Sequence, residues 1–367
     1  MFNDQYLGKK VLITGNTGFK GGWLTAWLLK LGAKVCGVSD KIPSNPAIFS
    51  EIGLETKIEH HFCDIRDLIR FSKILEDFEP DFVFHLAAQP IVSVSYDDPV
   101  DTISTNVMGT TVFLEALRRW NKECSVVVIT SDKCYENVEW YWGYKETDQL
   151  GGKDIYSGSK GAAEVIFHAY YHSFFSDERS KIRLATGRAG NVIGGGDWAK
   201  DRIVVDCIKN WAKGKSVEIR CPEATRPWQH VLEPLSGYLT LAADLSNNDT
   251  LLGESFNFGP RSEQTKTVLE LLTDLSHPWG FKSIDDAYCV TDNIPFHEAG
   301  LLKLNCDKAL FHLKWEANLS YKECVGFVGD WYFNHYNTEQ DMYQLTIEQI
   351  TQYEKIASER GLVWSQH

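Results

Sequence analysis

Five side chains that can donate or accept protons lie close together between residues 130 and 160. The stretch opens with Thr-Ser-Asp-Lys-Cys-Tyr and closes with Tyr-Ser-Gly-Ser-Lys. A hydroxyl, a carboxylate, a phenol and two ammonium groups can together move protons at several atoms of one substrate. We therefore interpret the stretch as a catalytic centre, with candidate catalytic residues Ser131, Asp132, Lys133, Tyr156 and Lys160.

Tyr156 and Lys160 lie four residues apart in Asp154–Ser176, which we predict to be helical, so both side chains share one face. An ammonium beside a phenol favours the phenolate and lowers the tyrosine pKa from about 10. Lowering this pKa to near 7 requires roughly 4 kcal/mol, and hence a dry site and a second positive charge. An oxidised nicotinamide ring is such a charge. Because Tyr-x-x-x-Lys is a common pattern, its meaning depends on the elements before it.

A glycine-rich turn between a strand and a helix precedes this stretch. Lys9–Thr14 is a short apolar run, and the periodicity of Trp23–Leu31 predicts a helix. Gly15, Gly18 and Gly21 form a GxxGxxG spacing, which differs from the common GxGxxG fingerprint. Such glycines allow close backbone approach, and the helix N-terminus presents N–H groups to a pyrophosphate. We therefore predict a dinucleotide site at the turn.

Residues at the ends of the next strands are further candidates for cofactor contact. The strand predicted at Ala33–Ser39 is followed by Asp40, whose carboxylate would bind ribose hydroxyls and favour NAD, and by Lys41, which would favour NADP. Asp64 ends another predicted strand and could contact the adenine. Lys20 lies inside the glycine turn, where it either adds positive charge near a phosphate or is simply solvated.

Strands and helices alternate through the first half of the chain. Predicted strands at 9–14, 33–39, 58–64, 81–88, 123–130 and 182–187 are separated by helical patterns, including one long amphipathic helix at Asp97–Trp120. This predicts a doubly wound parallel α/β sheet with ligands at the carboxyl ends of its strands. The pattern changes at Arg188–Asn191. We expect a cofactor domain, 1–188, and a smaller substrate domain, 189–367, with 225–260 returning in part to the first.

The amino-acid composition limits the classes of molecule that the protein is expected to bind. The chain has 367 residues, with 37 basic and 50 acidic side chains and a net charge of −13, which argues against nucleic acid and anionic membranes. No apolar run approaches a membrane span, and the N-terminus lacks a signal-peptide layout. Nine scattered cysteines without a Cys-x-x-Cys pair predict reduced thiols in a cytoplasmic protein and no metal site.

Several motifs together resemble the extended short-chain dehydrogenase/reductase family over nearly the whole chain. These are GxxGxxG, His-Leu-Ala-Ala at the end of the fourth predicted strand, Asn106, Ser131 and Tyr156-x-x-x-Lys160. The resemblance implies a Rossmann-type fold with bound NAD, and Asn106 as a functional residue although a helical asparagine usually faces solvent. It also implies that the tyrosine is the acid–base, that the lysine holds the nicotinamide ribose, and that the serine orients the substrate hydroxyl. The expected cofactor-binding residues are Gly15, Thr17, Gly18, Phe19, Lys20, Gly21, Asp40, Asp64, Ile65, Leu86, Ala87, Ala88, Asn106, Tyr156 and Lys160.

The family includes epimerases, dehydratases, reductases and decarboxylases, and Asp132-Lys133 favours dehydration. Removing a C5 proton while protonating a C6 hydroxyl needs an acid and a base beyond the tyrosine. Sugar-nucleotide dehydratases of the family usually carry Asp-Glu here, so Asp-Lys departs from that pattern. With GFKGGWL, GNVIGGGDW and RPWQHVLEPL, however, it resembles the dehydratases that act on CDP-glucose. The resemblance implies substrate-binding roles for Asn191, Arg202 and Arg226, and weaker candidates are Gln89 and His230.

The expected mechanism has three steps. Tyr156 takes the C4 hydroxyl proton as hydride passes from C4 to NAD. Lys133 or a neighbour then removes the C5 proton as Asp132 protonates the C6 oxygen, and hydride returns to C6. NAD would thus stay tightly bound and be regenerated in each cycle. Lys133 can act as a base only if its pKa is depressed, which burial and nearby Lys160 could supply.

Two alternatives stay open on the sequence. One is a nucleotide-sugar 4-epimerase or 4-reductase, and the other is a non-enzymatic nucleotide-sugar or NAD sensor on the same fold. Members of the family commonly pair through two long helices, which here would be Asp97–Trp120 and Asp154–Ser176. The expected assembly is therefore a homodimer or a dimer of dimers.

Overall fold

A seven-stranded parallel sheet forms the centre of the computed structural model, which describes residues 1–261, 264–291 and 301–366. Its strands are β1 Lys10–Thr14, β2 Lys34–Ser39, β3 Glu59–Phe62, β4 Phe82–His85, β5 Cys124–Ile129, β6 Ile182–Ala189 and β11 Ser255–Phe258. They lie in the order β11-β6-β5-β4-β1-β2-β3, and each neighbouring pair is parallel. The chain thus winds outward from β1 to one edge and then to the other. The prediction of a doubly wound α/β fold is confirmed.

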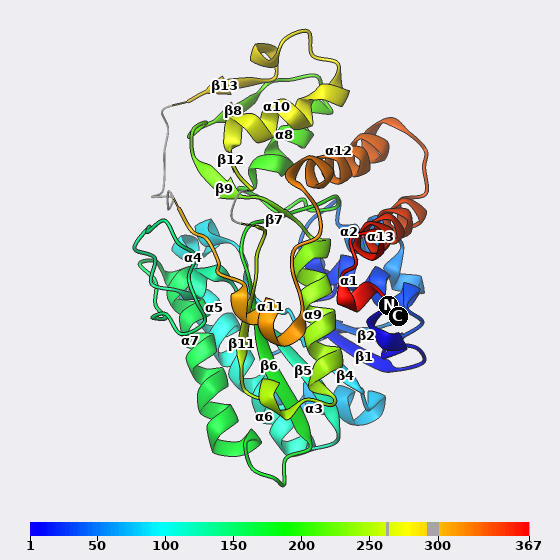
Figure 1. Ribbon diagram of the computed structural model, residues 1–367, viewed down its shortest axis with the longest axis vertical. Coiled ribbons are helices and arrows are strands. Elements are labelled where there is room, and N and C mark those ends of the chain that lie inside the picture. The colour runs from blue at the N-terminus through cyan, green and yellow to red at the C-terminus, as the bar shows by residue number, and fades with distance from the viewer. Residues whose placement is uncertain (262–263, 292–300, 367) are drawn as a thin grey trace.

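Helices cover both faces of the sheet (Figure 1). They are α1 Phe19–Lys30, α2 Ile48–Glu51, α3 Leu68–Phe78, α4 Val92–Asp97, α5 Pro99–Ile103, α6 Gly109–Trp120, α7 Ile155–Tyr170, α8 Ile203–Trp211, α9 Leu232–Leu245, α10 Val268–Ser276, α11 Asp307–Leu313, α12 Tyr321–Asn337 and α13 Met342–Glu359. Smaller strand pairs are formed by β7 Val192–Ile193, β8 Val217–Ile219, β9 Thr225–Pro227, β10 Gln229–His230, β12 Thr265–Thr267 and β13 Tyr288–Val290.

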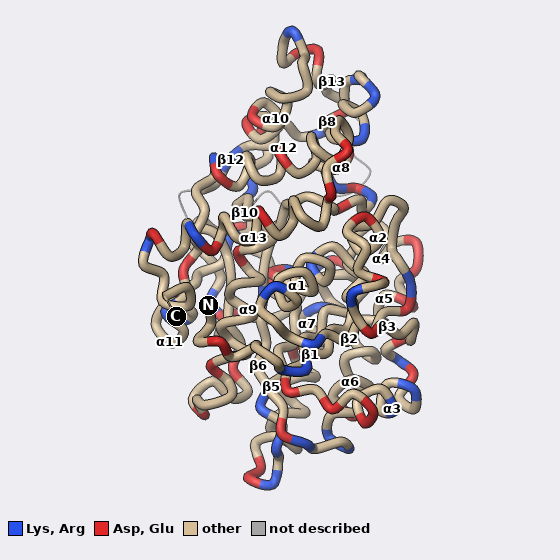
Figure 2. The backbone as a smooth tube through the Cα atoms, turned by 90° about the vertical axis from the view of Figure 1, so that its right-hand side faces the viewer, with Lys and Arg blue, Asp and Glu red and all other residues tan. Residues whose placement is uncertain are grey.

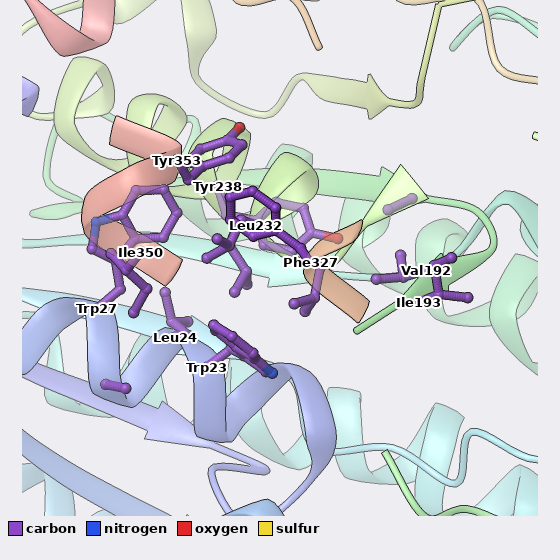
Figure 3. Packing of buried hydrophobic residues seen from close by; sticks show 14 of the residues in the cluster. Trp23, Leu24, Trp27, Val192, Ile193, Leu232, Tyr238, Phe327, Ile350 and Tyr353 are labelled. Atoms are coloured by element: carbon purple, nitrogen blue, oxygen red, sulfur yellow. The ribbon is translucent and has the colours of Figure 1, made fainter. Parts of the chain in front are cut away.

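Two hydrophobic cores lie on opposite faces of the sheet, and successive residues of β1 enter them alternately. Val11 and Ile13 belong to the core under α1, α9 and α13, whereas Leu12 belongs to the core under α3 and α6. In the first core, Trp27 of α1 packs against Tyr353 of α13, as the labelled side chains of Figure 3 show, and Trp23 packs against His230. Burying each large apolar side chain contributes about 2 kcal/mol. This packing fixes α1, and with it the glycine turn at its N-terminus.

The single long helix predicted at Asp97–Trp120 is wrong. Val92–Asp97 and Pro99–Ile103 are separate helices, because Pro99 disfavours a helical conformation at Asp98. The Asp98 side chain instead caps α5 by accepting the N–H of Asp101. A π-helical segment at Ser104–Met108 then joins α5 to α6. Apolar periodicity continues through all of these breaks, so periodicity alone predicts one helix.

The chain leaves the sheet after β6 and later returns to it. The segment containing α8, β8, α10 and β13 lies above the sheet in Figure 1. Residues 225–260 then supply α9, which packs against the sheet, and β11, which pairs with β6. The boundary at residues 188 and 189 between a cofactor and a substrate domain stays a prediction.

Charged residues of both signs are interspersed along the chain in the view of Figure 2. Among the described helices, none has the length and hydropathy needed to cross a membrane. All nine cysteines are free thiols, and six of them are buried, as the sequence predicts.

Candidate active site

The five predicted catalytic residues meet where the carboxyl end of β5 faces the start of α7. Ser131 follows β5, and Asp132–Cys134 forms one turn of 3-10 helix. Tyr156 and Lys160 lie in the first two turns of α7, whose N-terminus is capped by the Asp154 side chain. Tyr156 is only 7% exposed, and its hydroxyl hydrogen-bonds Ser131. The stretch predicted to be catalytic therefore folds into one compact site.

Burial controls the charges of Tyr156 and Lys160. The Lys160 ammonium lies 5.9 Å from the centre of the Tyr156 ring. Burial lowers the pKa of Lys160 from 10.5 to about 8 and raises the pKa of Tyr156 to about 12, with Arg202 opposing the latter change. The expectation that the lysine brings the tyrosine pKa below 10 is therefore wrong for the protein alone. Lowering that pKa from 12 to near 7 requires roughly 7 kcal/mol. A large part of this free energy would have to come from a bound cation.

Asp132 has the properties of a proton donor. It is 4% exposed, and burial raises its pKa, although Lys133 and a 3.0 Å hydrogen bond from Ser131 act in the opposite direction. Lys133 is half-buried, and its backbone N–H donates to the same Ser131 hydroxyl at 3.2 Å. A carboxyl with a raised pKa keeps its proton longer and can deliver it to a leaving oxygen.

Gly190 is a site residue that the sequence reading did not single out. A Cβ atom at this position would lie 2.7 Å from a carboxylate oxygen of Asp132. A glycine one residue after β6 therefore makes room for the buried acid. The signal was present in the glycine-rich run after β6, but only the fold shows which side chain needs the space.

Lys20 lies close enough to Asp132 and Lys160 for their charges to act on its ammonium group. It belongs to the first turn of α1, is partly buried, and interacts electrostatically with Arg202, Asp132 and Lys160. Burial, with Arg202 and Lys160, lowers its pKa from 10.5 to about 8. At neutral pH a measurable fraction of such a lysine is an uncharged amine. Lys20 is therefore a second candidate for the base that removes a proton next to Asp132.

The glycine turn has the close backbone packing that a dinucleotide-binding turn requires. Gly15 has φ +75°, and a Cβ there would lie 2.8 Å from the backbone of Leu86 and Ala87. A Cβ on Gly21 would lie 2.2 Å from the Gly15 carbonyl oxygen. No side chain caps the N-terminus of α1 at Gly18. The turn thus fits a pyrophosphate, and the loop after β4, which includes half-buried Ala88, fits a flat ring.

Three other predicted cofactor residues bond within the protein. The Thr17 hydroxyl donates to the Lys41 carbonyl at 2.7 Å and so fixes the turn against the end of β2. Asp40 is exposed and its carboxylate lies 3.6 Å from the Lys41 ammonium. A negative and a positive charge therefore both lie at the end of β2, as the sequence indicates. Asp64 accepts hydrogen bonds from Nε and Nη2 of Arg66, and these bonds lower its pKa. Their contacts with a cofactor stay predictions.

Phe19 and Ile65 contribute apolar contacts. The ring of Phe19 lies against Gly194, where a Cβ would meet it at 3.0 Å, so the glycine turn packs on the glycine-rich run after β6. Ile65 is 5% exposed and belongs to the core under α3 and α6. Its side chain is therefore structural, and only its backbone is left to face a ligand.

Asn106 is buried, with only 2% of its surface exposed. This agrees with the functional role that the family resemblance implied, and not with the solvent-facing position usual for a helical asparagine. Its side chain accepts the Gln89 N–H at 2.8 Å and donates to the Ser159 hydroxyl at 2.8 Å. It lies in the π-helical segment before α6, and such segments are frequent at functional sites. Asn106 therefore joins the loop after β4 to the turn of α7 that carries Lys160.

The predicted substrate residues differ in how the structure uses them. Arg202 precedes α8, lies 3.8 Å from Asp197, and acts electrostatically on Tyr156. Asn191 is half-buried just after β6, and Arg226 donates to the Thr225 carbonyl from β9. The Gln89 amide already donates to the Thr102 hydroxyl of α5 at 2.9 Å.

The prediction that His230 contacts substrate is contradicted. The side chain is fully buried, with its ring against Trp23 and Phe327. Its Nδ1 accepts the Leu232 N–H at 3.3 Å, and burial lowers its pKa to about 3. A neutral, enclosed imidazole cannot reach a phosphate, so His230 belongs to the core between α1 and α12.

A sequence model of the GDP-mannose 4,6 dehydratase family matches residues 12–326, from β1 into α12. The chain belongs to this family. The CDP-glucose 4,6-dehydratase of Salmonella typhimurium is 46% identical over 330 residues, which are 89% of this chain and 90% of the relative. The CDP-paratose 2-epimerase of Salmonella typhi is 28% identical over 88% of this chain and 98% of its own. The resemblance to nucleotide-sugar enzymes drawn from the motifs is thus confirmed.

Solved structures related to this family share its fold. The dTDP-glucose 4,6-dehydratase of Streptomyces venezuelae, solved with NAD and TYD bound, superposes with a TM-score of 0.75. It is 19% identical and covers 89% of this chain and 97% of its own. At this identity the superposition establishes the Rossmann-type fold and no more.

Proposed function

We propose that the protein is a CDP-glucose 4,6-dehydratase, which converts CDP-glucose to CDP-4-keto-6-deoxyglucose. The observation that carries the proposal is a buried carboxyl, Asp132, with a raised pKa beside the Tyr156–Lys160 pair. Elimination of water needs this additional acid, whereas oxidation at C4 alone does not. The 46% identical relative of that name supports the choice of CDP-glucose.

Each catalytic side chain has a separate proton to move. Tyr156, held by Ser131, accepts the proton of the C4 hydroxyl. The resulting 4-keto group acidifies the C5 hydrogen, which Lys133 removes, or Lys20 in its place. Asp132 donates its proton to the C6 oxygen, which leaves as water. When hydride returns to C6, the protonated lysine gives a proton back to C5, after exchange with solvent. Lys160 supports the phenolate from the next turn of α7.

The cradle formed by the turn at Gly15, Gly18 and Gly21 and by the β4 exit suits NAD, and we assign it to the proposed cofactor domain, residues 1–188. The backbone amides of Phe19 and Lys20 at the start of α1 would hold the pyrophosphate. When bound, the cofactor would supply hydride transfer from C4 and back to C6, and it would be regenerated in each cycle. An enzyme of this kind gains from binding NAD tightly.

The nucleotide diphosphate is assigned to Arg202, Arg226 and Asn191, with residues 189–367 as the proposed substrate domain. A protein with a net charge of −13 needs local cations to bind a doubly charged substrate. Arginine suits this role because its guanidinium can bind phosphate oxygens in pairs. Because Arg202 acts electrostatically on Tyr156, its charge would lie near the reacting sugar, which supports this assignment.

Product masses test the proposal directly. Purified protein incubated with CDP-glucose, without added reductant, is expected to give a sugar nucleotide lighter by one water. UDP-glucose and dTDP-glucose serve as matched substrates and are expected to react more slowly. An isomer of unchanged mass would indicate an epimerase, and tight binding without any product would indicate a sensor. Either result would exclude the dehydratase.

We also propose that two copies associate through α5, α6 and α7. Large apolar side chains are exposed on α5, on α7 and on the π-helical segments that precede α6 and follow α7: Val100, Ile103, Met108, Ile155, Val165 and Phe174. Adjacent helices with exposed apolar residues can pair with a second copy around a two-fold axis. Sedimentation equilibrium is expected to give twice the chain mass, and Val165→Lys to shift it toward a monomer. A monomeric native protein would refute this assembly.

The proposed compartment is the cytoplasm. Nine free thiols, six of them buried, are typical of a protein that folds where thiols stay reduced.

A further inference from the structure

A buried ion pair, Glu164–Arg188, lies next to the catalytic segment and takes no part in the proposed proton transfers. Glu164 of α7 and Arg188 of β6 have 0% and 1% exposed side chains. The guanidinium donates in bidentate fashion, Nε to Oε1 and Nη2 to Oε2, both at 2.9 Å. Burial opposes the charge on Glu164, yet Arg188 holds its pKa below the ordinary value. A buried ion pair is often no more stabilising than an apolar pair, so its geometry is the more informative property.

Both ends of the segment that carries Asp132 and Lys133 are bonded to this ion pair. At one end, the Thr130 hydroxyl donates to Oε1 of Glu164. At the other, Nη1 of Arg188 donates to the Tyr135 hydroxyl at 2.7 Å. The two contacts enclose the four residues between them. A single carboxylate–guanidinium unit therefore fixes where the catalytic segment begins and ends.

The same unit is fastened to the other half of the site. Glu164 follows Lys160 by four residues, so it lies one turn further along the same face of α7. Arg188 precedes Gly190, the residue that leaves room for Asp132, by two positions. Tyr135 in turn donates to Asn257 of β11 at 2.8 Å and stacks on Tyr144. The ion pair thus connects β5, β6, α7 and β11 beneath the active site.

We propose that the Glu164–Arg188 pair is a positioning device that holds the segment 130–135 in register with α7. It governs the elimination of water more strongly than the oxidation at C4. The reason is geometric: Tyr156 and Lys160 are part of α7 itself, so the oxidation step depends on the anchored segment only through Ser131. Asp132 and Lys133, the acid and the base of the elimination, both depend on the two anchored ends. The inference rests on the proposed dehydratase function.

Two substitutions test the anchors without leaving a buried charge unpaired. Tyr135→Phe keeps the ring that stacks on Tyr144 and removes the hydroxyl, and Thr130→Val removes the other contact. In each variant, C4 oxidation in a single turnover is expected to stay within about twofold of the native rate. Water loss is expected to slow about tenfold, the effect of losing one hydrogen bond to a charged group. Reduced nicotinamide should therefore accumulate, as near-ultraviolet absorbance reports.

Tyr6→Phe is the matched control. Tyr6 is also buried, at 1% exposure, and its hydroxyl donates to the Leu239 carbonyl at 2.6 Å, outside the anchored segment. It is expected to lower the melting temperature without changing the ratio of oxidation to elimination. Arg188→Met alone would leave Glu164 buried and unpaired, so Glu164→Gln combined with Arg188→Met serves as the variant of the pair itself. That variant is expected to shift the ratio in the same direction as Tyr135→Phe.

The outcomes separate the inference from the proposed function. If Tyr135→Phe and Thr130→Val slow oxidation and elimination equally, or resemble Tyr6→Phe, the positioning role is refuted. If the native protein removes no water from CDP-glucose, the dehydratase function fails and the inference with it. A shift in the ratio, in a native protein that dehydrates CDP-glucose, supports both.

Discussion

Tyr156→Phe is expected to slow C4 oxidation of CDP-glucose by about 10²- to 10⁴-fold, the usual contribution of a positioned acid or base. The substitution removes the hydroxyl that bonds Ser131 and leaves the ring in place. Without the phenol, no group is left in position to accept the C4 hydroxyl proton. The measurement is the rate at which reduced nicotinamide appears in a single turnover.

Binding of CDP-glucose is the control for this variant. Arg202 and Arg226, which are assigned to the diphosphate, are unchanged, so calorimetry is expected to give a dissociation constant within about threefold of the native value. A Tyr156→Phe protein that still oxidises C4 within tenfold of the native rate would show that another group takes the proton. Phenylalanine also cannot titrate, so any residual rate should lose the pH dependence that the tyrosine confers.

Lys133→Met is expected to permit C4 oxidation and to block elimination, so reduced nicotinamide builds up and little water is lost. Removal of the C5 proton requires a base, and losing a positioned base slows a step by about 10²- to 10⁴-fold. Methionine has a similar length and no charge. The signal is a rise in near-ultraviolet absorbance that persists while substrate is present.

Lys20→Met is the comparison that decides between the two lysines. The structure places Lys20 in electrostatic contact with Asp132, and its pKa is lowered to about 8. If Lys20→Met accumulates reduced nicotinamide while Lys133→Met turns over at the native rate, Lys20 is the base and the sequence-based assignment is wrong. If Lys20→Met instead weakens NAD binding and leaves the ratio of steps unchanged, Lys20 serves the phosphates alone.

The sequence predicted the sheet well because a parallel strand buried on both faces is a continuous apolar run. The strand-turn-helix context of Gly15 and the four-residue spacing of Tyr156 and Lys160 are also local features. The long helix at Asp97–Trp120 was wrong because an apolar face continues across the break at Asp98 and Pro99. Pro99 itself indicated the break, since proline restricts the backbone of the residue before it.

Features that depend on tertiary burial were not predictable. The sequence gives the separation of Tyr156 from Lys160 but not how dry their surroundings are, and burial reverses the expected direction of the tyrosine pKa. His230 stands in a motif with Arg226, yet packing turns it into the core. Arg188 meets Tyr135, 53 residues earlier in the chain, and no local pattern links such partners.

One measurement tests the central claim most directly: the mass spectrum of the product formed from CDP-glucose carrying deuterium at C4. A 4,6-dehydratase moves the hydrogen from C4 to C6 within one molecule. We expect a product that has lost one water and keeps the deuterium, with fragment masses that place the label at C6. Loss of the label to solvent, or a product that keeps its full mass, would contradict it.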